Sequence, residues 1–366
     1  MDNVTRIGVD LAKNVIQLHG VDSAGRVLLK KSISRHKFLD YFANLPSCQV
    51  AMEACSASHY WALKLRALGH EARLIAPQFA APYRKGGKPV KNDARGAEAV
   101  CEAAGRPQMR FVPVKTADQQ NTLVVHRMRT GFVEERTALV NRLRAELVEF
   151  GVFLPQGIDA LRAHFLDALE DGATELNGTA RTALLRGWEH WQALDREIAW
   201  FDGQIAAQVK HDPNAQRVMA IVGIGPLTAS AAIATVGDAR QFRNGRQMAA
   251  WLGAVPKQAS SGGKTRLGHI TKQGNTYLRT LLFQGARTAV TTAHRRDDRL
   301  SRWIVQLRAR VGLYRTVVAV ANKHARILWA ILAKGERFDP SHVPTRPHAG
   351  PVPQGNPMTG SMAVAG

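Results

Sequence analysis

The stretch Ile7-Gly8-Val9-Asp10-Leu11-Ala12-Lys13 places a single carboxylate and a glycine in an otherwise apolar run. A short apolar run of this kind predicts a buried β-strand. A carboxylate in such a strand needs a partner, and a bound divalent cation is a good one. On this stretch alone, an Asp that caps the following turn is an equally good interpretation.

The residues that follow predict the rest of a mixed α/β region. Strands are predicted at residues 4–10, 15–21, 27–33, 48–53 and 72–76, with a turn at 22–25. Helices are predicted at residues 35–45, 58–68 and 93–104. The order is an antiparallel meander of three strands, then helix, strand, helix and strand. It is the order seen in ribonuclease-H-like nucleases.

Three carboxylates occupy informative places in this order. Asp10 ends the first predicted strand and Glu53 ends the fourth, so neighbouring strands would bring both to one edge of the sheet. Asp93 begins a predicted helix after a basic loop at residues 84–91, and an N-cap would be the favoured explanation if it stood alone. Together, three carboxylates beside cations favour paired divalent metals, Mg²⁺ or Mn²⁺, acting on a phosphodiester.

Length and charge narrow the class of protein. The chain has 366 residues, which favours two or three domains, and a net charge of +21, which favours a polyanionic partner such as nucleic acid. An anionic membrane surface is the competing partner. However, no apolar run is long enough to span a bilayer, and neither end forms a basic amphipathic helix. The first residues lack the pattern of a signal peptide, so we expect a cytoplasmic protein without a membrane partner.

The three cysteines, Cys48, Cys55 and Cys101, show no CxxC spacing. This argues against a disulfide framework or a zinc site. We expect all three to be small buried apolar residues.

Two long helical tracts follow. The first spans residues 117–150 and repeats apolar residues every seven positions, at Val133, Val140, Leu147 and Leu154, with Leu143 and Phe150 in the offset row. The second repeats them at Leu184, Trp191, Ile198 and Ile205, with Trp188 and Phe201 alongside. The pattern predicts an antiparallel coiled coil joined by residues 155–180, although two ordinary bundle helices fit nearly as well. Trp188 and Trp191 are expected in the core.

Beyond the second tract, a glycine-containing turn precedes a helix at Val222-Gly223-Ile224-Gly225-Pro226. The backbone amides of Gly223 and Gly225 are candidates for phosphate contact, as in helix-hairpin-helix elements. A simple turn explains the same residues.

The loop at residues 254–275 combines Ser260 and Ser261 with the cations Lys264, Arg266 and Lys272. These cations are candidate phosphate contacts. A serine among them could attack phosphorus, although the loop alone names no nucleophile. Further helices are predicted at 276–290 and 302–332, and a disordered tail is predicted from residue 339.

Several motifs together identify a family resemblance. They are GVDLAK, AMEAC, KNDARGAEAV, FVPVK, GFVEERTALVNRLR, VGIGPLTA and AAWLGAVPKQASSGGKTRLGHITKQGNTYLR. Over residues 4–335 the chain resembles the DEDD transposases of the IS-one-ten family, and more closely its IS-eleven-eleven group. The resemblance implies a RuvC-like, ribonuclease-H-fold α/β domain at residues 1–112 and a coiled-coil region at 113–212. It also implies a mainly α-helical C-terminal transposase domain at 213–338, followed by the tail at 339–366.

The resemblance also implies an activity. It indicates a bacterial, nucleoid-associated recombinase that excises and inserts a mobile element in double-stranded donor and target DNA, directed by a structured noncoding bridge RNA. Asp10, Glu53 and Asp93 match the family's first three acidic positions. Ser261 best matches the serine that forms a covalent link to DNA, with Ser260 as the alternate. Because the two half-sites lie on separate domains, we expect a homo-oligomer, a dimer or tetramer, with a composite site.

One position departs from the family pattern. Gly96 stands where the fourth acid would lie, three residues after Asp93. Three residues turn a helix by about 300°, so both positions share a face, whereas Glu98 points away. Losing one ligand should weaken metal binding. Two alternatives stay open: a metal-only endonuclease of the junction-resolving kind, and a catalytically impaired copy that only binds nucleic acid.

Overall fold

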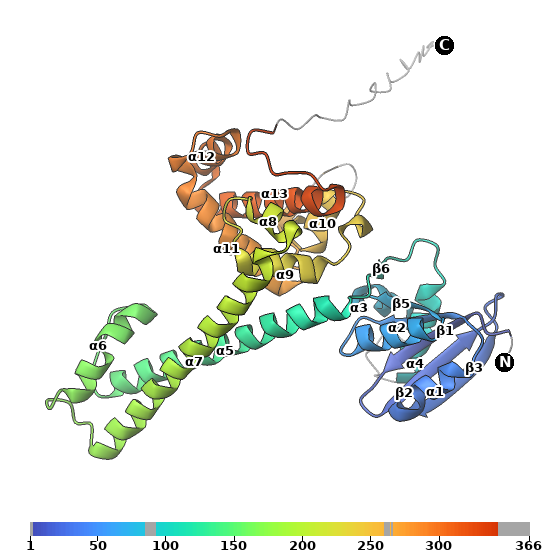
Figure 1. Cartoon of the computed structure of the whole chain (residues 1–366), viewed down its shortest axis with the longest axis horizontal. Coiled ribbons are helices and arrows are strands. Elements are labelled where there is room, and N and C mark those ends of the chain that lie inside the picture. Colours follow the sequence, from blue (N-terminus) through green and yellow to red (C-terminus); the bar gives the residue numbers. More distant parts are fainter. Residues whose placement is uncertain (1–2, 85–92, 260–263, 265, 343–366) are drawn as a thin grey trace, which may run out of the picture.

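The computed structural model describes residues 3–84, 93–259, 264 and 266–342, without the side chains of Asp93 and Ala94. Figure 1 shows three parts: an N-terminal sheet with helices on it, a long pair of helices that projects as an arm, and a C-terminal group of helices. The tail is predicted from residue 339, but residues 339–342 are described, and the carbonyl of Pro340 accepts a 3.0 Å hydrogen bond from the amide of Leu300. Residues 343–366 of the tail and residues 85–91 of the basic loop predicted at 84–91 lie outside the described residues.

The N-terminal sheet has six strands in the order β3-β2-β1-β4-β5-β6. Their bounds are Arg6–Leu11 (β1), Val15–Val21 (β2), Val27–Ser34 (β3), Gln49–Glu53 (β4), Glu71–Ile75 (β5) and Phe111–Val112 (β6). The first three strands form the expected antiparallel meander, and β4 pairs in parallel with both β1 and β5. All five predicted strands are present, and the short antiparallel β6 adds a sixth.

Helices cover both faces of this sheet. Their bounds are Arg35–Lys37 (η1), Phe38–Ala43 (α1), Ser58–Ala67 (α2), Pro77–Ala80 (α3), Ala81–Tyr83 (η2) and Asp93–Ala104 (α4). Alternation along each strand sends Ile7, Val9, Val50 and Met52 into the core beneath α1 and α2. The opposite face carries Gly8 and Ala51 against α4.

The arm consists of α5 (Ala117–Glu149) and α7 (Gly178–Lys210), which run in opposite directions side by side, with α6 (Ile158–Glu170) at the far end (Figure 1). Most predicted heptad residues are buried between them, including Val140, Leu147, Leu184 and Trp191. Trp188 is also core, because its ring stacks on that of Phe165 from α6 at 5.2 Å between centroids.

Two residues of the heptad pattern do not follow it. Phe150 is 40% exposed, and Leu154 lies beyond the end of α5. The apolar pattern continues beyond the end of the helix, but the chain turns at Gly151, where φ is +76°. This backbone conformation ends the helix although apolar residues continue.

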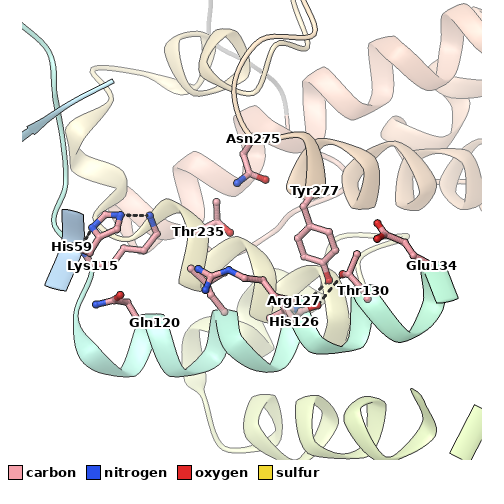
Figure 2. Close-up of a pocket in the computed structure, with 12 residues that line it drawn as sticks. His59, Lys115, Gln120, His126, Arg127, Thr130, Glu134, Thr235, Asn275 and Tyr277 are labelled. Atoms are coloured by element: carbon pink, nitrogen blue, oxygen red, sulfur yellow. Dashed lines mark hydrogen bonds between the residues drawn. The ribbon is translucent and has the colours of Figure 1, made fainter. Parts of the chain in front are cut away.

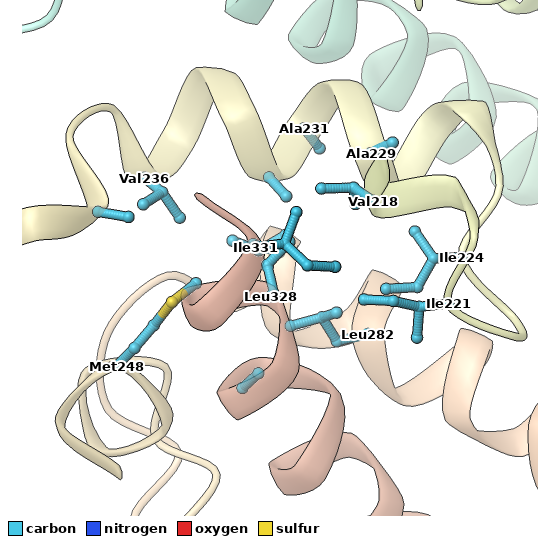
Figure 3. Close-up of a cluster of buried hydrophobic side chains, with 14 of the residues drawn as sticks. Val218, Ile221, Ile224, Ala229, Ala231, Val236, Met248, Leu282, Leu328 and Ile331 are labelled. Atoms are coloured by element: carbon cyan, nitrogen blue, oxygen red, sulfur yellow. The ribbon is translucent and has the colours of Figure 1, made fainter. Parts of the chain in front are cut away.

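The C-terminal part is mainly helical and packs on its own core. Its helices are Pro213–Met219 (α8), Pro226–Val236 (α9), Ala239–Gln241 (η3), Gly245–Trp251 (α10), Thr276–Thr292 (α11), Ala293–Arg295 (η4), Arg299–Val311 (α12) and Leu313–Lys334 (α13). Figure 3 shows residues of α8, α9, α10, α11 and α13, among them Val218, Ala231, Met248, Leu282 and Ile331, converging on one apolar cluster.

Two predictions in this part need correction or addition. The single helix expected at residues 302–332 is wrong: the chain breaks at Gly312, where φ is +80°, and α12 and α13 are separate helices. A two-stranded hairpin, β7 (Pro256–Gln258) and β8 (Leu267–Ile270), carries the serine-containing loop. None of the helices in the described parts of the chain is both long and apolar enough to cross a membrane.

Candidate functional site

The acidic edge, which we define as Asp10, Glu53 and the facing residue Gly96, is built by strand pairing. Strand β1 lies parallel to β4, with Val9 opposite Met52, so Asp10 and Glu53 follow at the same end of adjacent strands. Side chains alternate along a strand, so Asp10 shares the face of Gly8 and Glu53 shares the face of Ala51, the face covered by α4. The sequence-based expectation that these two carboxylates meet at one edge is confirmed.

The electrostatic surroundings agree with this proximity. Partial desolvation by the surrounding chain raises the pKa of the Cys55 thiol, and the nearby negative charges of Glu53 and Asp10 raise it further. Both carboxylates therefore lie within electrostatic reach of one thiol. Cys48 and Cys101 are buried as expected, but Cys55 is exposed, so the expectation of burial is wrong for it. The reason is its position at the sheet edge, in the turn between β4 and α2.

Helix α4 approaches the acidic edge closely because two glycines let it. A Cβ on Gly8 would lie 2.2 Å from the backbone oxygen of Ala97, so only glycine permits this packing of β1 on α4. At the residue directly before Ala97, a Cβ on Gly96 would lie 1.9 Å from Oδ2 of Asp10. The carboxylate of Asp10 therefore fills the space that a side chain at position 96 would enter.

Asp93 lies one helical turn before Gly96, at the start of α4. The structure describes the backbone of Asp93 but not its side chain, so the structure does not place its carboxylate relative to Asp10 and Glu53. Among the side chains that are described, no three His, Cys, Asp or Glu residues form a group able to hold a metal ion.

The described residues nevertheless suit a hard cation. Asp10 and Glu53 supply carboxylate oxygens, the donors that Mg²⁺ prefers. Glu53 already accepts a 2.8 Å charge-assisted hydrogen bond from Nη2 of Arg84, so positive charge is favourable at this edge. The Asp10 carboxylate, packed over Gly96, lies on the same face.

The candidate nucleophiles Ser260 and Ser261 lie outside the described residues. The strands that flank them are described: β7 and β8 pair antiparallel, and the backbone amide of Ala259 donates to the carbonyl of Arg266 at 3.0 Å. Lys264, Arg266 and Lys272 are all exposed. The cationic hairpin, which we define as residues 256–272, thus presents these three side chains at the surface of the C-terminal part, whereas the acidic edge belongs to the sheet.

The two glycines of the turn before α9 differ in their surroundings. Gly223 has φ +88°, and a Cβ there would lie 2.0 Å from the backbone oxygen of Gly285, so this residue is packed against α11. Gly225 is the N-cap of α9, and a Cβ there would meet open space. Of the two, only Gly225 has room for a ligand beside it.

A second constellation, which the sequence patterns did not single out, lines a cavity of about 370 Å³ where all three parts of the protein meet (Figure 2). His59 comes from α2, Lys115 precedes α5, and Arg127 lies on α5. Asn275 and Tyr277 come from the start of α11. Residues this far apart in sequence carry no shared local signal, although Lys115 belongs to the FVPVK motif.

The wall of this junction cavity is held by hydrogen bonds of buried His126. Its Nδ1 lies 2.9 Å from the hydroxyl of Tyr277, and its Nε2 lies 3.0 Å from Oγ of Ser230 on α9. Burial lowers the pKa of His126 to about 4, with Arg129 adding to the effect, so the ring is neutral at pH 7. These bonds attach α5 to the C-terminal helices.

Comparison with known proteins agrees with this architecture. Residues 7–151 match a transposase family of the DEDD, IS110 type, and residues 215–301 match the transposase IS116/IS110/IS902 family. A probable family 20 transposase of Pseudomonas aeruginosa is 48% identical over 92% of this chain and 99% of its own length.

Two relatives are named after their mobile elements. The transposase for insertion sequence element IS1111A of Coxiella burnetii is 37% identical, over 92% of this chain and 92% of its own length. The transposase for insertion sequence element IS1328 of Yersinia enterocolitica is also 37% identical, over 92% of this chain and 99% of its own length. With these matches across both ends of the fold, the chain belongs to the IS116/IS110/IS902 family of transposases.

Proposed function

We propose that this protein is a DNA transposase that excises and inserts a mobile element, acting on double-stranded donor and target DNA in the bacterial cytoplasm. The observation that carries the proposal is the acidic edge: Asp10, the last residue but one of β1, and Glu53, the last residue of β4, lie at the same end of adjacent parallel strands on the face covered by α4. Family membership supports the same activity.

The carboxylates would hold divalent metal. We assign Asp10, Glu53 and Asp93 as ligands of Mg²⁺ or Mn²⁺, which when bound orients and polarises the oxygens of the reacting phosphodiester. The chain's own residues prepare the edge for this. Arg84 balances the charge of Glu53, and the strand register fixes Asp10 beside it.

The cationic hairpin would supply the second half of the chemistry. In this proposal the hydroxyl of Ser261 loses its proton as Oγ bonds to phosphorus, the bond from phosphorus to one deoxyribose oxygen breaks, and the leaving oxygen takes up a proton in exchange. The reverse displacement rejoins the strand. Lys264, Arg266 and Lys272 would stabilise the extra negative charge on the phosphoryl oxygens, since they are exposed and belong to the same stretch of sequence as the serine.

Because the acidic edge and the cationic hairpin belong to different parts of the fold, we propose a composite site completed between protomers of a dimer or tetramer. We also propose that residues 1–112 form a RuvC-like domain, 113–212 a coiled coil and 213–338 the transposase domain. A structured bridge RNA would select donor and target by base pairing, which leaves the protein to contact backbones.

Position 96 bears on whether this chain is active. An acid there would face Asp10 directly, because a Cβ at Gly96 lies against the Asp10 carboxylate. We propose that Gly96 replaces the fourth acid of the family and weakens metal binding. A carboxylate at position 96 would require the side chain of Asp10 to move, because a Cβ there would lie 1.9 Å from Oδ2 and 2.8 Å from Cγ of Asp10.

Trapping the covalent intermediate tests the serine chemistry. The protein is incubated with Mg²⁺, bridge RNA and labelled element-end DNA, and is then denatured and resolved by mass. We expect a protein-DNA adduct that Ser261→Ala abolishes and Ser260→Ala retains. Cleavage without any adduct would instead identify a metal-only endonuclease.

Restoring the fourth acid tests the metal site separately. Gly96→Asp should bind Mn²⁺ more tightly than the natural chain in a calorimetric titration, and Gly96→Ala serves as the control for the added Cβ. Recombination is then measured for the same variants. If only Gly96→Asp recombines, the natural chain is a catalytically impaired copy; if Mn²⁺ affinity does not change, position 96 is not a ligand position.

A further inference from the structure

The junction cavity contains two hydrogen-bond donors that face each other. The backbone amide of Lys115 donates to Nδ1 of His59 at 3.1 Å. An Nδ1 that accepts carries no proton, so the neutral ring holds its proton on Nε2. That Nε2 lies 3.4 Å from Nζ of Lys115, and a lysine ammonium has donors but no acceptor (Figure 2).

Two donors in contact need an acceptor that both can share. A charged oxygen in the cavity beside His59 and Lys115 would accept from both groups. Charge-assisted hydrogen bonds of this kind are about twice as strong as neutral ones. The alternative is that Lys115 is an uncharged amine that accepts the proton of His59.

The surrounding residues add positive charge and amide donors at the same end of the cavity. Arg127 and Gln120 extend from α5, and Asn275 lies opposite on the C-terminal side (Figure 2). Glu134 also lines the cavity, but it is seven residues beyond Arg127 on α5, about 10 Å along the helix. The end that holds Lys115 and Arg127 is therefore cationic.

The titration behaviour of these groups points to the same excess of positive charge. Burial and the charges of Lys115 and Arg127 lower the pKa of His59 to about 4. Burial, and then Arg127, also lower the pKa of Lys115. Arg127 thus destabilises the charged form of Lys115, an effect that a bound anion would relieve.

We infer that the junction cavity is a phosphate-binding site, formed by the Nε2–H of His59, the ammonium of Lys115 and the guanidinium of Arg127. Its volume of about 370 Å³ falls within the range of ligand pockets. The favoured source of the phosphate is a nucleic-acid backbone, a part of the inference that rests on the proposed function. Because α2, α5 and α11 all line the cavity, an occupied site would connect nucleic-acid binding to the arrangement of the three parts.

Chemical protection of Lys115 tests the site without any assumption about transposition. The full chain is reductively methylated in increasing inorganic phosphate, with chloride at matched ionic strength as the reference, and each lysine is quantified by peptide mass. We expect phosphate to reduce modification of Lys115 several-fold and to leave exposed Lys210 of α7 unchanged. Equal modification of Lys115 in phosphate and chloride would overturn the inference and favour the uncharged amine.

Salt-dependent binding identifies the source of the phosphate. Affinity for a short DNA duplex and for structured RNA is measured against salt for the natural chain, Lys115→Met, Lys115→Arg and the control Lys210→Met, each checked for unchanged thermal unfolding. Lys115→Met loses one phosphate contact. For at least one of the two nucleic acids, its slope of log affinity against log salt concentration should therefore be smaller than that of the natural chain by about 1. Lys115→Arg and Lys210→Met should keep the natural slope.

The two experiments separate the possible outcomes. Protection by inorganic phosphate together with a lower slope supports the whole inference. Protection with unchanged slopes for both DNA and RNA overturns the nucleic-acid source and leaves a site for free phosphate. Protection in a chain that shows no recombination would contradict the proposed function but not this site.

Discussion

The acidic edge and the cationic hairpin are held in the fold by different means. The edge is built into the core, since Asp10 and Glu53 lie at the ends of strands with buried residues, and α4 packs on this face of the sheet at Gly8 and Gly96. The hairpin consists of two short strands whose residues are almost all exposed. Function and stability should therefore be linked at the edge and separable at the hairpin, which substitutions can test.

The largest effect should come from Gly8→Ala. The added Cβ would lie 2.2 Å from the backbone oxygen of Ala97, and neither β1 nor α4 can move without disturbing the core. We expect the free energy of unfolding to fall by about 3 kcal/mol, the upper part of the range for overpacking. Denaturant unfolding followed by circular dichroism measures it.

The matched control is Gly203→Ala, in exposed α7, where a Cβ would meet open space. Alanine is a better helix former than glycine, so this change should stabilise the protein by about 0.5–1 kcal/mol. If Gly8→Ala and Gly203→Ala changed the free energy of unfolding by the same small amount, β1 and α4 would not pack as closely as described.

The second-largest effect concerns the acid sensitivity of stability in the C-terminal part, to which the hairpin belongs. His324 on α13 is 0% exposed, and neither ring nitrogen has a hydrogen-bond partner among the described residues. Burial, with help from Lys323, lowers the pKa of His324 to about 4, below the ordinary value of 6.5. Protonation therefore favours the unfolded chain. The stability that comes from burying the neutral ring is fully present above pH 6.5 and is lost as the pH falls from 6.5 toward 4.

The loss from His324 should approach about 3 kcal/mol at pH 4, since one pKa unit corresponds to about 1.4 kcal/mol. His324→Leu should reduce this acid sensitivity, and should also stabilise the protein at pH 7 by about 1–2 kcal/mol because it removes buried unpaired polar atoms. Hydrogen exchange measured by region at pH 7 and pH 4.5 separates α13 from the sheet. A variant that loses protection in α13 at pH 4.5 as much as the natural chain would contradict this assignment.

The third effect should fall on binding and leave stability intact. Lys264 and Lys272 are exposed on the hairpin, so replacing both by Ala should change the free energy of unfolding by less than about 0.5 kcal/mol. If each contacts a phosphate, the slope of log affinity against log salt should decrease by about 2. Duplex binding by fluorescence anisotropy measures the slope. Lys30→Ala on β3 is the exposed control. An equal change of slope per lysine in that variant would show that the hairpin lysines contact DNA no more specifically than other surface lysines.

The features that could be predicted from the sequence are those set by interactions between residues close together in the chain. The five strands and the placement of Asp10 and Glu53 at one edge came from local patterns, because alternation and strand order are written in neighbouring residues. Capping is equally local. The side chain of Thr116 forms a reciprocal capping box with Gln119 at the predicted start of α5.

Features that depend on distant residues escaped prediction. The exposure of Cys55 and the junction cavity arise from where the chain places its turns and helix ends in space. The break at Gly312 escaped prediction for a different reason, because helical residues continue on both sides of it; its φ of +80° ends α12 by a local glycine signal. Gly223 reads as a phosphate-binding glycine, but Gly285, far along the chain, occupies its neighbourhood.

The smallest effect should come from Gly225→Ser, which tests the remaining glycine of that turn. Gly225 is the N-cap of α9 with φ −96°, a conformation open to any residue, and no atom lies within 4 Å of a Cβ placed there. Serine caps a helix slightly better than glycine, so the protein should gain about 0.3 kcal/mol in stability. The same side chain would occupy the first amides of α9, so affinity for duplex DNA should fall if a phosphate binds them. Thermal unfolding and anisotropy on one preparation measure both quantities, and a more stable variant with unchanged affinity would show that Gly225 serves only the turn.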